Sequence, residues 1–147
     1  LISAEGGNPF SALAMSGGLL YGTASSGGTS NAGAIFKIGT DGSDFAVLHQ
    51  CASGAGNTPN AGLVVSGGTL FGATVFGGGS GWGTLFRLET DGSGYTLLKE
   101  FNYSDIRSPL GGVALAGNTL YGTRRRRASA RKPSMAWTRA SSVEGCA

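Results

Sequence analysis

The sequence predicts an all-β fold of tandem 50-residue repeats, each with four strands, that forms part of a β-propeller. The first observation is a spacing of 50 residues that recurs at matched Pro, Leu or Val, and Gly positions. The second is that residues 9–58 and 59–108 share 17 identities in 50 without a gap. The third is a series of short apolar runs separated by turns in a chain with 28 glycines, which is typical of short strands. The spacing is carried by Pro9, Pro59 and Pro109; Leu13, Leu63 and Val113; and Gly17, Gly67 and Gly117.

The repeat register divides the chain into a β region, residues 1–123, and a basic segment, residues 124–147. Internal repeats of this length indicate stacked supersecondary units. Within the β region we assign residues 1–8 to a partial repeat, 9–58 and 59–108 to complete repeats, and 109–123 to another partial repeat.

The second complete copy predicts four strands in order. They are the apolar run 63–65, the run 69–75 after the Gly67-Gly68 turn, the run 84–89 after a glycine-rich loop, and the run 95–101. In the third run, Leu85 and Arg87 alternate with Phe86 and Leu88, which predicts one buried face and one partly wet face.

The turn before the fourth run is Asp91-Gly92-Ser93. Asp-Gly favours the positive φ angles that match the twist of a hairpin. Four short antiparallel strands in about 50 residues form the unit of a propeller blade. A β-solenoid is the second architecture that the repeat allows.

Composition excludes several classes of protein. An apolar share of 40% excludes simple disorder, and glycine without a triplet period excludes collagen. No apolar run approaches the ~18 residues of a membrane-spanning helix. The chain opens at Leu1 without an initiator Met or signal peptide, so we expect an internal piece of a larger protein.

The net charge of +3 combines two segments of different character. Up to Thr123 there are four basic and seven acidic residues, a net of −3; from Arg124 there are seven basic residues and one acidic, a net of +6. The basic segment begins with four consecutive arginines and shows no strand pattern, so we expect it to be unstructured. A basic arm for nucleic acid is one interpretation, because arginine clusters neutralise phosphates.

A shifted reading frame is the interpretation we favour for the basic segment, and an unrelated fused sequence is a third. When the codons of residues 132–138 are read from their third bases, they can encode Thr-Val-Tyr-Gly-Val-Asp. That string resembles residues 84–89 and falls within two residues of the expected offset of 50.

Residues 33–38 followed by Thr40-Asp41-Gly42-Ser43, and residues 83–88 followed by Thr90-Asp91-Gly92-Ser93, resemble the Gloeo-Verruco tandem repeat. The Pro-x-x-x-Leu and Leu-Tyr-Gly-Thr elements complete the likeness, which covers residues 1–123. The resemblance implies propeller-like folds within long, secreted or surface-anchored bacterial proteins. It carries over no catalytic residue.

Two complete repeats cannot close a propeller, which takes typically four to eight blades. Repeat proteins bury their core against neighbouring units. We therefore expect the isolated chain to be marginally stable and to associate through its open edges.

His49 is the only histidine and matches Lys99 in the repeat register, so we expect a solvated position rather than a catalytic base or metal ligand. Cys51 matches Phe101 and is predicted to be a small buried hydrophobe. A nucleophilic Cys51 would need a base, which His49 could supply from the same strand face.

Asp41 and Asp91 could supply oxygen ligands to calcium, but few carboxylates lie close by, and a role in turns is the better account. The glycine-rich loops 27–28 and 77–79 lack the Lys-Ser/Thr of a phosphate-binding loop, so we expect connectors. Tyr21, Phe71 and Tyr121 share a repeat position and are predicted to pack between blades. Trp82, in a loop, is the open candidate for stacking on sugars.

We therefore expect no catalytic residue, no metal and no cofactor. The first hypothesis is a non-enzymatic repeat module, for binding or as a scaffold, in a larger secreted or surface protein. Its partners would be neighbouring repeats and a glycan or protein. The alternatives are a fragment of a propeller-type polysaccharide-active enzyme and nucleic-acid binding through the arginine-rich segment.

Overall fold

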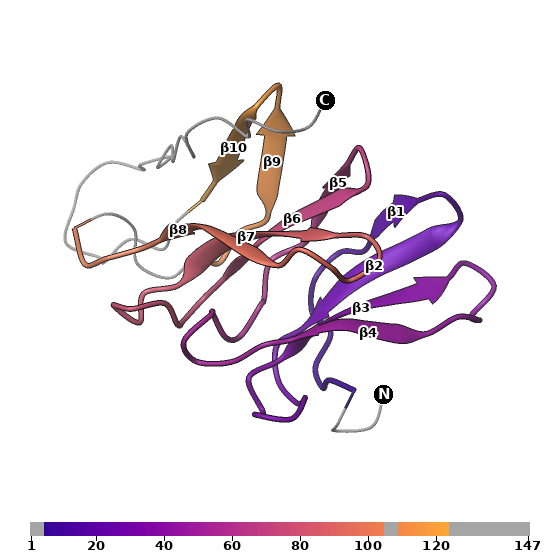
Figure 1. Cartoon of the computed structure of the whole chain (residues 1–147), viewed down its shortest axis with the longest axis horizontal. Coiled ribbons are helices and arrows are strands. Elements are labelled where there is room, and N and C mark those ends of the chain that lie inside the picture. Colours follow the sequence, from indigo (N-terminus) through magenta and orange to yellow (C-terminus); the bar gives the residue numbers. More distant parts are fainter. Residues whose placement is uncertain (1–4, 105–108, 124–147) are drawn as a thin grey trace.

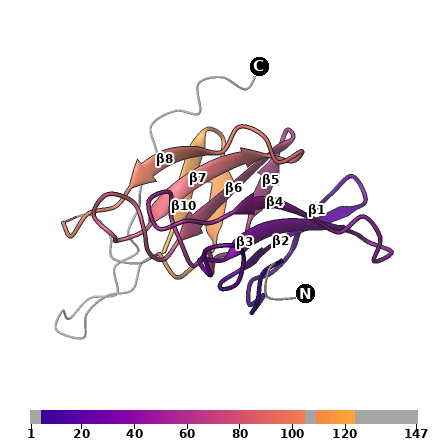
Figure 2. The ribbon, with the colours of Figure 1, turned by 60° about the horizontal axis from the view of Figure 1, so that its bottom comes forward.

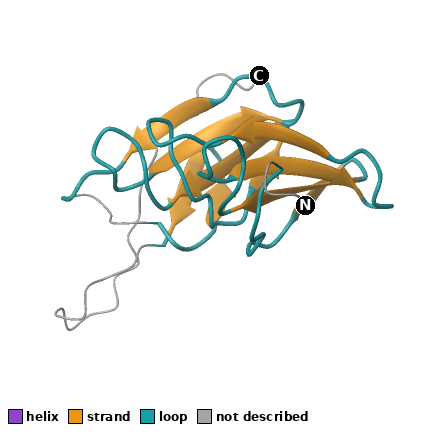
Figure 3. Cartoon of the chain, turned by 90° about the horizontal axis from the view of Figure 1, so that it is seen from below, coloured by secondary structure: helices purple, strands orange, loops and turns teal. Residues whose placement is uncertain are grey.

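A computed structural model describes residues 5–104 and 109–123, and these residues form ten strands and no helix (Figures 1 and 3). The strands are β1 Ala14–Ser16, β2 Leu19–Ala24, β3 Ala34–Gly39, β4 Ala46–Gln50, β5 Val64–Ser66, β6 Thr69–Thr74, β7 Thr84–Glu89, β8 Thr96–Glu100, β9 Val113–Ala116 and β10 Thr119–Gly122. The basic segment 124–147 lies outside the described residues.

The strands form two four-stranded antiparallel sheets and a two-stranded hairpin. The first sheet has the order β1-β2-β3-β4 and the second the order β5-β6-β7-β8, so each is a simple meander. The third unit is the hairpin β9-β10. The four predicted strands of the second repeat are confirmed, with boundaries that differ by one residue at most.

Glycine pairs close the first turn of each sheet. Gly17 and Gly18 have φ angles of 58° and 78°, and Gly67 and Gly68 have 57° and 83°. Because Ser16 pairs with Leu19 and Ser66 with Thr69, the loops contain two residues that both have positive φ. This is the turn that matches the twist of a β-hairpin.

A β-bulge occurs at the same place in both sheets. In the first sheet, Ile35 pairs with His49 and Phe36 with Val47, which leaves Leu48 as the extra residue. In the second sheet, Leu85 pairs with Lys99 and Phe86 with Leu97, so Leu98 is the extra residue. Leu48 and Leu98 are partly buried and pack against a hydrophobic cluster, so the bulge adds an apolar side chain to the sheet face.

The three units lie side by side, with the first strand of each next to the first strand of the following unit. β1 contacts β5, and β5 contacts β9 (Figures 1 and 2). The long connections, residues 25–33 and 75–83, lie at the opposite end of each sheet from the two-residue turns (Figure 1). Sheets whose first strands gather on one side and whose last strands spread apart have the arrangement of neighbouring propeller blades. The described residues do not close into a ring.

The core lies between the sheets in two hydrophobic clusters. One joins the first sheet to the second and includes Tyr21, Ile35, Leu63, Leu70, Phe86 and Leu88. The other joins the second sheet to the hairpin and includes Ala61, Phe71, Ala73, Leu85, Phe101, Val113 and Leu120. The second sheet is therefore covered on both faces.

The predicted alternation of β7 is confirmed. Phe86 and Leu88 are buried on one face, whereas Arg87 and Glu89 keep intermediate exposure on the other. Leu85, on the same face as Arg87, is 4% exposed because the hairpin β9-β10 packs against it.

Gly72 in β6 shows how closely the core is packed. A Cβ at this position would lie 2.5 Å from Phe86 Cζ and 2.7 Å from Leu63 Cδ2. Gly22 in β2 has the same surroundings, with Leu13 Cδ2 and Phe36 Cζ each at 2.6 Å. A glycine within a strand here makes room for the aromatic ring of the neighbouring strand.

Candidate functional site

The contact between successive units is the feature that the repeat builds most consistently. Tyr21 of the first sheet is 3% exposed and packs against the second sheet. Phe71, at the same repeat position, is 2% exposed and packs against the hairpin. The predicted packing between units is therefore confirmed for Tyr21 and Phe71, and Tyr121 follows them in the register with intermediate exposure.

A strap of backbone ties the first two sheets together at the loop end. The Thr58 N–H donates to the carbonyl of Ala32 in the first unit at 2.8 Å. The Thr58 carbonyl in turn accepts a hydrogen bond from the Val75 N–H in the second unit at 3.1 Å. Thr58 therefore bonds to the loops of both units, at a φ of 54° that few residues other than glycine and asparagine adopt.

The repeated proline lies against the glycine that ends the loop of the preceding unit. A Cβ at Gly33 would lie 2.6 Å from Pro59 Cδ, and one at Gly83 would lie 3.0 Å from Pro109 Cδ. Pro59 and Pro109 are buried, whereas Pro9 is exposed. The proline spacing seen in the sequence is therefore a packing contact between neighbouring repeats.

The outer face of the first sheet is open, although it carries the same residue types as the covered face of the second sheet. Leu13 is 48% exposed, whereas its counterpart Leu63 is 7% exposed. Met15 is 68% exposed, whereas its counterpart Val65 packs against the cluster between the sheets.

The aromatic rings of this face repeat as well. Phe36 and Phe45 pair with ring centroids 5.8 Å apart, as Phe86 and Tyr95 do at 5.4 Å. Tyr95 is covered in addition by His49 of the first sheet (centroids 3.7 Å).

His49 is not at a solvated position, and the expectation that it would be is wrong. It has intermediate exposure, and its Nε2 is buried without a hydrogen-bond partner among the described residues. Desolvation lowers the pKa of the imidazole. The strand pairing explains the difference: His49 lies opposite Ile35, on the face that the second sheet covers.

Cys51 is buried, as predicted, at 2% exposure. Desolvation raises the pKa of its thiol to about 12. A thiol with so high a pKa is almost entirely protonated at neutral pH, and the thiolate is the nucleophilic form. The geometry therefore favours a core residue over a nucleophile.

Asp41 and Asp91 lie in turns, as the pattern predicts. Oδ1 of Asp41 accepts hydrogen bonds from the Ser43 N–H at 2.9 Å and from Ser43 Oγ at 2.6 Å. Oδ1 of Asp91 accepts from the Ser93 N–H at 2.8 Å. Hydrogen bonds from Ser43 and Ser93 lower the pKa of the two carboxyl groups. Among the described residues, no group of three or more His, Cys, Asp or Glu side chains could hold a metal ion.

The glycine-rich loops use their own backbone groups internally. The Gly33 N–H donates to the Gly27 carbonyl at 3.0 Å, and the Gly83 N–H donates to the Gly77 carbonyl at 3.1 Å. These hydrogen bonds close the loops that connect β2 to β3 and β6 to β7.

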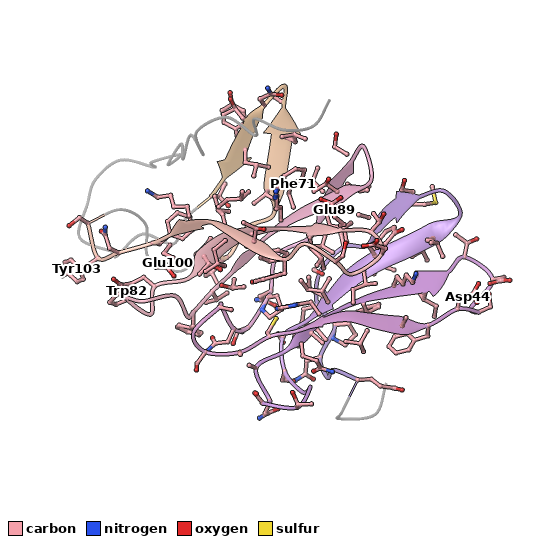
Figure 4. The ribbon with its side chains drawn as sticks, viewed as in Figure 1. Asp44, Phe71, Trp82, Glu89, Glu100 and Tyr103 are labelled. Atoms are coloured by element: carbon pink, nitrogen blue, oxygen red, sulfur yellow. The ribbon has the colours of Figure 1, made fainter. Side chains whose placement is uncertain are left out.

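Trp82 contacts a second aromatic residue, Tyr103, which the repeat pattern did not predict. The rings of Trp82 and Tyr103 meet edge to face, with centroids 5.9 Å apart and planes at 72°. Tyr103 is 65% exposed, and Trp82 is partly buried against the cluster of the second sheet. Figure 4 shows both residues beside Glu100 at one end of the second sheet, away from Glu89 and Asp44.

Comparison of the repeats could have found this cluster, because the first repeat has small residues at the same places. Trp82 matches Ala32 and Tyr103 matches Ser53. The two rings are therefore not part of the pattern that the repeats share.

Among the described residues, no helix is long and apolar enough to cross a membrane.

Comparison with solved structures gives a match to a chain of a crystal structure titled Nidogen/Laminin Complex, which contains a β-propeller. The sequence identity is 20% and the TM-score is 0.52, and the match covers 73% of this chain and 35% of that chain. This chain thus spans about a third of its structural neighbour, and the likeness concerns the fold alone. Among curated proteins, none matches the chain.

The sequence profile of the Gloeobacter/Verrucomicrobia repeat matches residues 1–133. The match includes both complete repeats and the hairpin, so the predicted resemblance is confirmed. The structure agrees with it, because each repeat forms one antiparallel sheet that packs on the next. The chain therefore belongs to the Gloeobacter/Verrucomicrobia repeat family.

Proposed function

We propose that this chain is a non-enzymatic repeat module that forms neighbouring blades of a propeller in a larger secreted or surface protein. Its blades act as a scaffold that holds binding loops at one end of the ring. The observation that carries this proposal is the contrast between two equivalent sheet faces. Leu63 is 7% exposed beneath the first sheet, whereas Leu13, at the same repeat position, is 48% exposed.

The occupant that fits the open face is another repeat of the same kind. Its position equivalent to Tyr21 would face Leu13, and its position equivalent to Gly33 would receive Pro9, as Gly33 receives Pro59. Stacked repeats bury a continuous core in this way, whereas a unit with an open face remains exposed to solvent.

The secreted or surface location is part of the proposal and rests on membership of the family. The non-enzymatic role is supported by the state of the thiol and of two carboxyl groups that could otherwise take part in catalysis. Cys51 is buried and protonated, and the carboxyl groups of Asp41 and Asp91 are occupied in turns.

Sedimentation of the full chain over a range of concentrations tests the proposal. We expect association that increases with concentration, because the open face buries apolar surface when another copy covers it. Met15→Glu places a charge on this face, where Met15 is 68% exposed, and is expected to reduce association. Tyr103→Ser changes a residue of similar exposure at the loop end and serves as the matched control. A monomer with a sharp thermal transition would contradict the proposal.

A further inference from the structure

The loop end of the second sheet carries aromatic and acidic side chains where the loop end of the first sheet carries small or uncharged ones. Trp82, Glu100 and Tyr103, which we call the loop-end cluster, replace Ala32, Gln50 and Ser53 of the first repeat. One framework contact is shared, because the N–H groups of Gly33 and Gly83 both donate to a glycine carbonyl of their own loop.

Gln50 makes a hydrogen bond to the backbone of the neighbouring loop, and Glu100 makes no equivalent bond within the part of the chain that the structure describes. Oε1 of Gln50 accepts a hydrogen bond from the Thr29 N–H at 3.1 Å and so holds the loop against β4. Gly79 takes the place of Thr29 in the second sheet, and Glu100 Oε2 lies 3.4 Å from the Cβ position of this glycine. No hydrogen-bond donor is paired with the Glu100 carboxylate among the described residues. An exposed carboxylate without a donor offers two acceptor oxygens to a ligand.

The aromatic pair supplies an apolar surface beside this carboxylate. Trp82 is fixed by its contact with the buried cluster of the second sheet, and its edge-to-face contact with Tyr103 positions the second ring. Tyr103 keeps 65% of its surface exposed in this contact. Two anchored rings give contact area at low cost in conformational entropy, because each has only two side-chain torsions to restrict.

We propose that the loop-end cluster binds a neutral saccharide. The apolar face of a pyranose would lie on the exposed ring, and sugar hydroxyls would donate to the Glu100 carboxylate. An anionic ligand is disfavoured by that carboxylate. The rim adds exposed hydroxyl side chains at Ser80 and Ser104, which can donate to and accept from sugar hydroxyls. A quaternary ammonium ion, which also binds to aromatic rings, has no N–H group and forms no such hydrogen bonds. The inference rests on the proposed function and names the class of ligand that the loops of the scaffold would bind.

Tryptophan fluorescence provides the test. The chain has two tryptophans, so Trp137→Phe leaves Trp82 as the only reporter. Cellohexaose, maltohexaose and xylohexaose are titrated into this protein, and we expect at least one to change the Trp82 emission in a saturable way. Glu100→Gln restores the residue of the first repeat and is expected to weaken binding by about tenfold or more, as loss of a charge-assisted hydrogen bond does. Tyr103→Ser likewise restores the residue of the first repeat, and we expect it to weaken binding to a similar degree.

Two control variants make the same kinds of change elsewhere in the chain. One loses a carboxylate, as Glu100→Gln does, and the other loses an exposed aromatic ring, as Tyr103→Ser does. Glu89→Gln removes a carboxylate that accepts from Thr69 Oγ1 at 3.0 Å, and Phe10→Ser removes an aromatic ring that is 77% exposed. Both lie outside the loop-end cluster and are expected to leave binding unchanged.

A folded protein, as judged by circular dichroism, that responds to none of the three saccharides overturns the inference. A response to tetramethylammonium alone, or saccharide binding that Glu100→Gln and Tyr103→Ser leave unchanged, also overturns it. Sedimentation separates this outcome from failure of the scaffold proposal. Met15→Glu should reduce association without changing saccharide binding, whereas Glu100→Gln should weaken saccharide binding without changing association.

Discussion

The imidazole of His49 and the phenol ring of Tyr95 stack face to face across the two sheets, with centroids 3.7 Å apart and planes 4° from parallel. The Tyr95 hydroxyl donates to the Ala55 carbonyl at 2.8 Å, which fixes the ring in the interface. His49 Nε2 is buried and has no partner among the described residues. Burial therefore favours a neutral imidazole, since a charge there would lose its hydration without gaining a hydrogen bond.

Stability should fall as the pH falls below about 6.5, the ordinary pKa of histidine. Desolvation lowers the pKa of His49 in the folded state, so the unfolded chain binds the proton more readily. Stability then decreases with decreasing pH until the folded-state pKa is reached, and changes little below that from this group. Thermal unfolding of the full chain at several pH values between 5 and 8 measures the effect.

His49→Phe is the control for this pH dependence. Phenylalanine keeps the aromatic stack and removes the titratable group, and the chain has no second histidine. We expect a melting temperature that varies little over the same range. A pH dependence as steep as that of the unsubstituted chain would assign the effect to other groups. The pKa values of Cys51 and Tyr95 are raised by desolvation, so neither titrates in this range.

Leu63→Ala and Leu13→Ala form a matched pair at one repeat position. Leu63 is buried beneath the first sheet, and we expect its truncation to cost about 2–5 kcal/mol of unfolding free energy, as for other core leucines. Leu13 is 48% exposed, and we expect less than about 1 kcal/mol, in the range of exposed positions. Chemical denaturation of the two variants measures both values. Equal costs would mean that the open face of the first sheet is covered in solution.

Gly72→Ala should destabilise the second sheet by about 1–3 kcal/mol, the usual cost of overpacking a core. The added methyl would lie 2.5 Å from Phe86 Cζ and 2.7 Å from Leu63 Cδ2, so the aromatic ring must move. Gly54→Ala is the control, because a Cβ there meets no atom within 4 Å. Phe86→Leu combined with Gly72→Ala should recover part of the loss. If Gly72→Ala is as stable as Gly54→Ala, the packing argument fails.

The strands and their turns could be predicted because each repeat signals them locally. Glycine pairs with positive φ mark one turn and Asp-Gly-Ser the other, and a register of 50 residues checks each assignment against a second copy. Contacts between sheets could not be predicted in the same way. His49 was compared with Lys99, but the cover over His49 comes from Tyr95 of the next sheet, and register alone does not show which face a neighbour covers.

The aromatic pair shows a second limit of the repeat register. Alignment of two copies draws attention to positions that agree, whereas Tyr103 and Trp82 lie at positions that differ. Their contact joins the loop after β6 to the connection after β8, segments that are about 20 residues apart in sequence. Differences between repeats are therefore the places to search for binding residues once the common positions are explained by packing.

Asp91→Ala should lower the melting temperature, whereas Asp91→Asn should leave it nearly unchanged. The side-chain oxygen that accepts from the Ser93 N–H is kept in asparagine and lost in alanine. Addition of calcium, or of a chelator, should shift neither the unsubstituted chain nor the asparagine variant. A calcium-dependent increase in melting temperature that Asp91→Asn abolishes would show that the turn is a metal site instead.

The nucleotide sequence from codon 120 onward tests the interpretation of residues 124–147, which lie outside the described residues. We expect a shifted frame to restore a strand like residues 84–89, followed by further Pro and Asp-Gly-Ser marks at 50-residue spacing. That result would identify the arginine-rich segment as a product of the wrong frame. If no frame restores the repeat and the present one ends at a stop codon, the basic arm is genuine. Salt-dependent DNA retention, with a chain truncated after Thr123 as control, would then decide whether it binds nucleic acid.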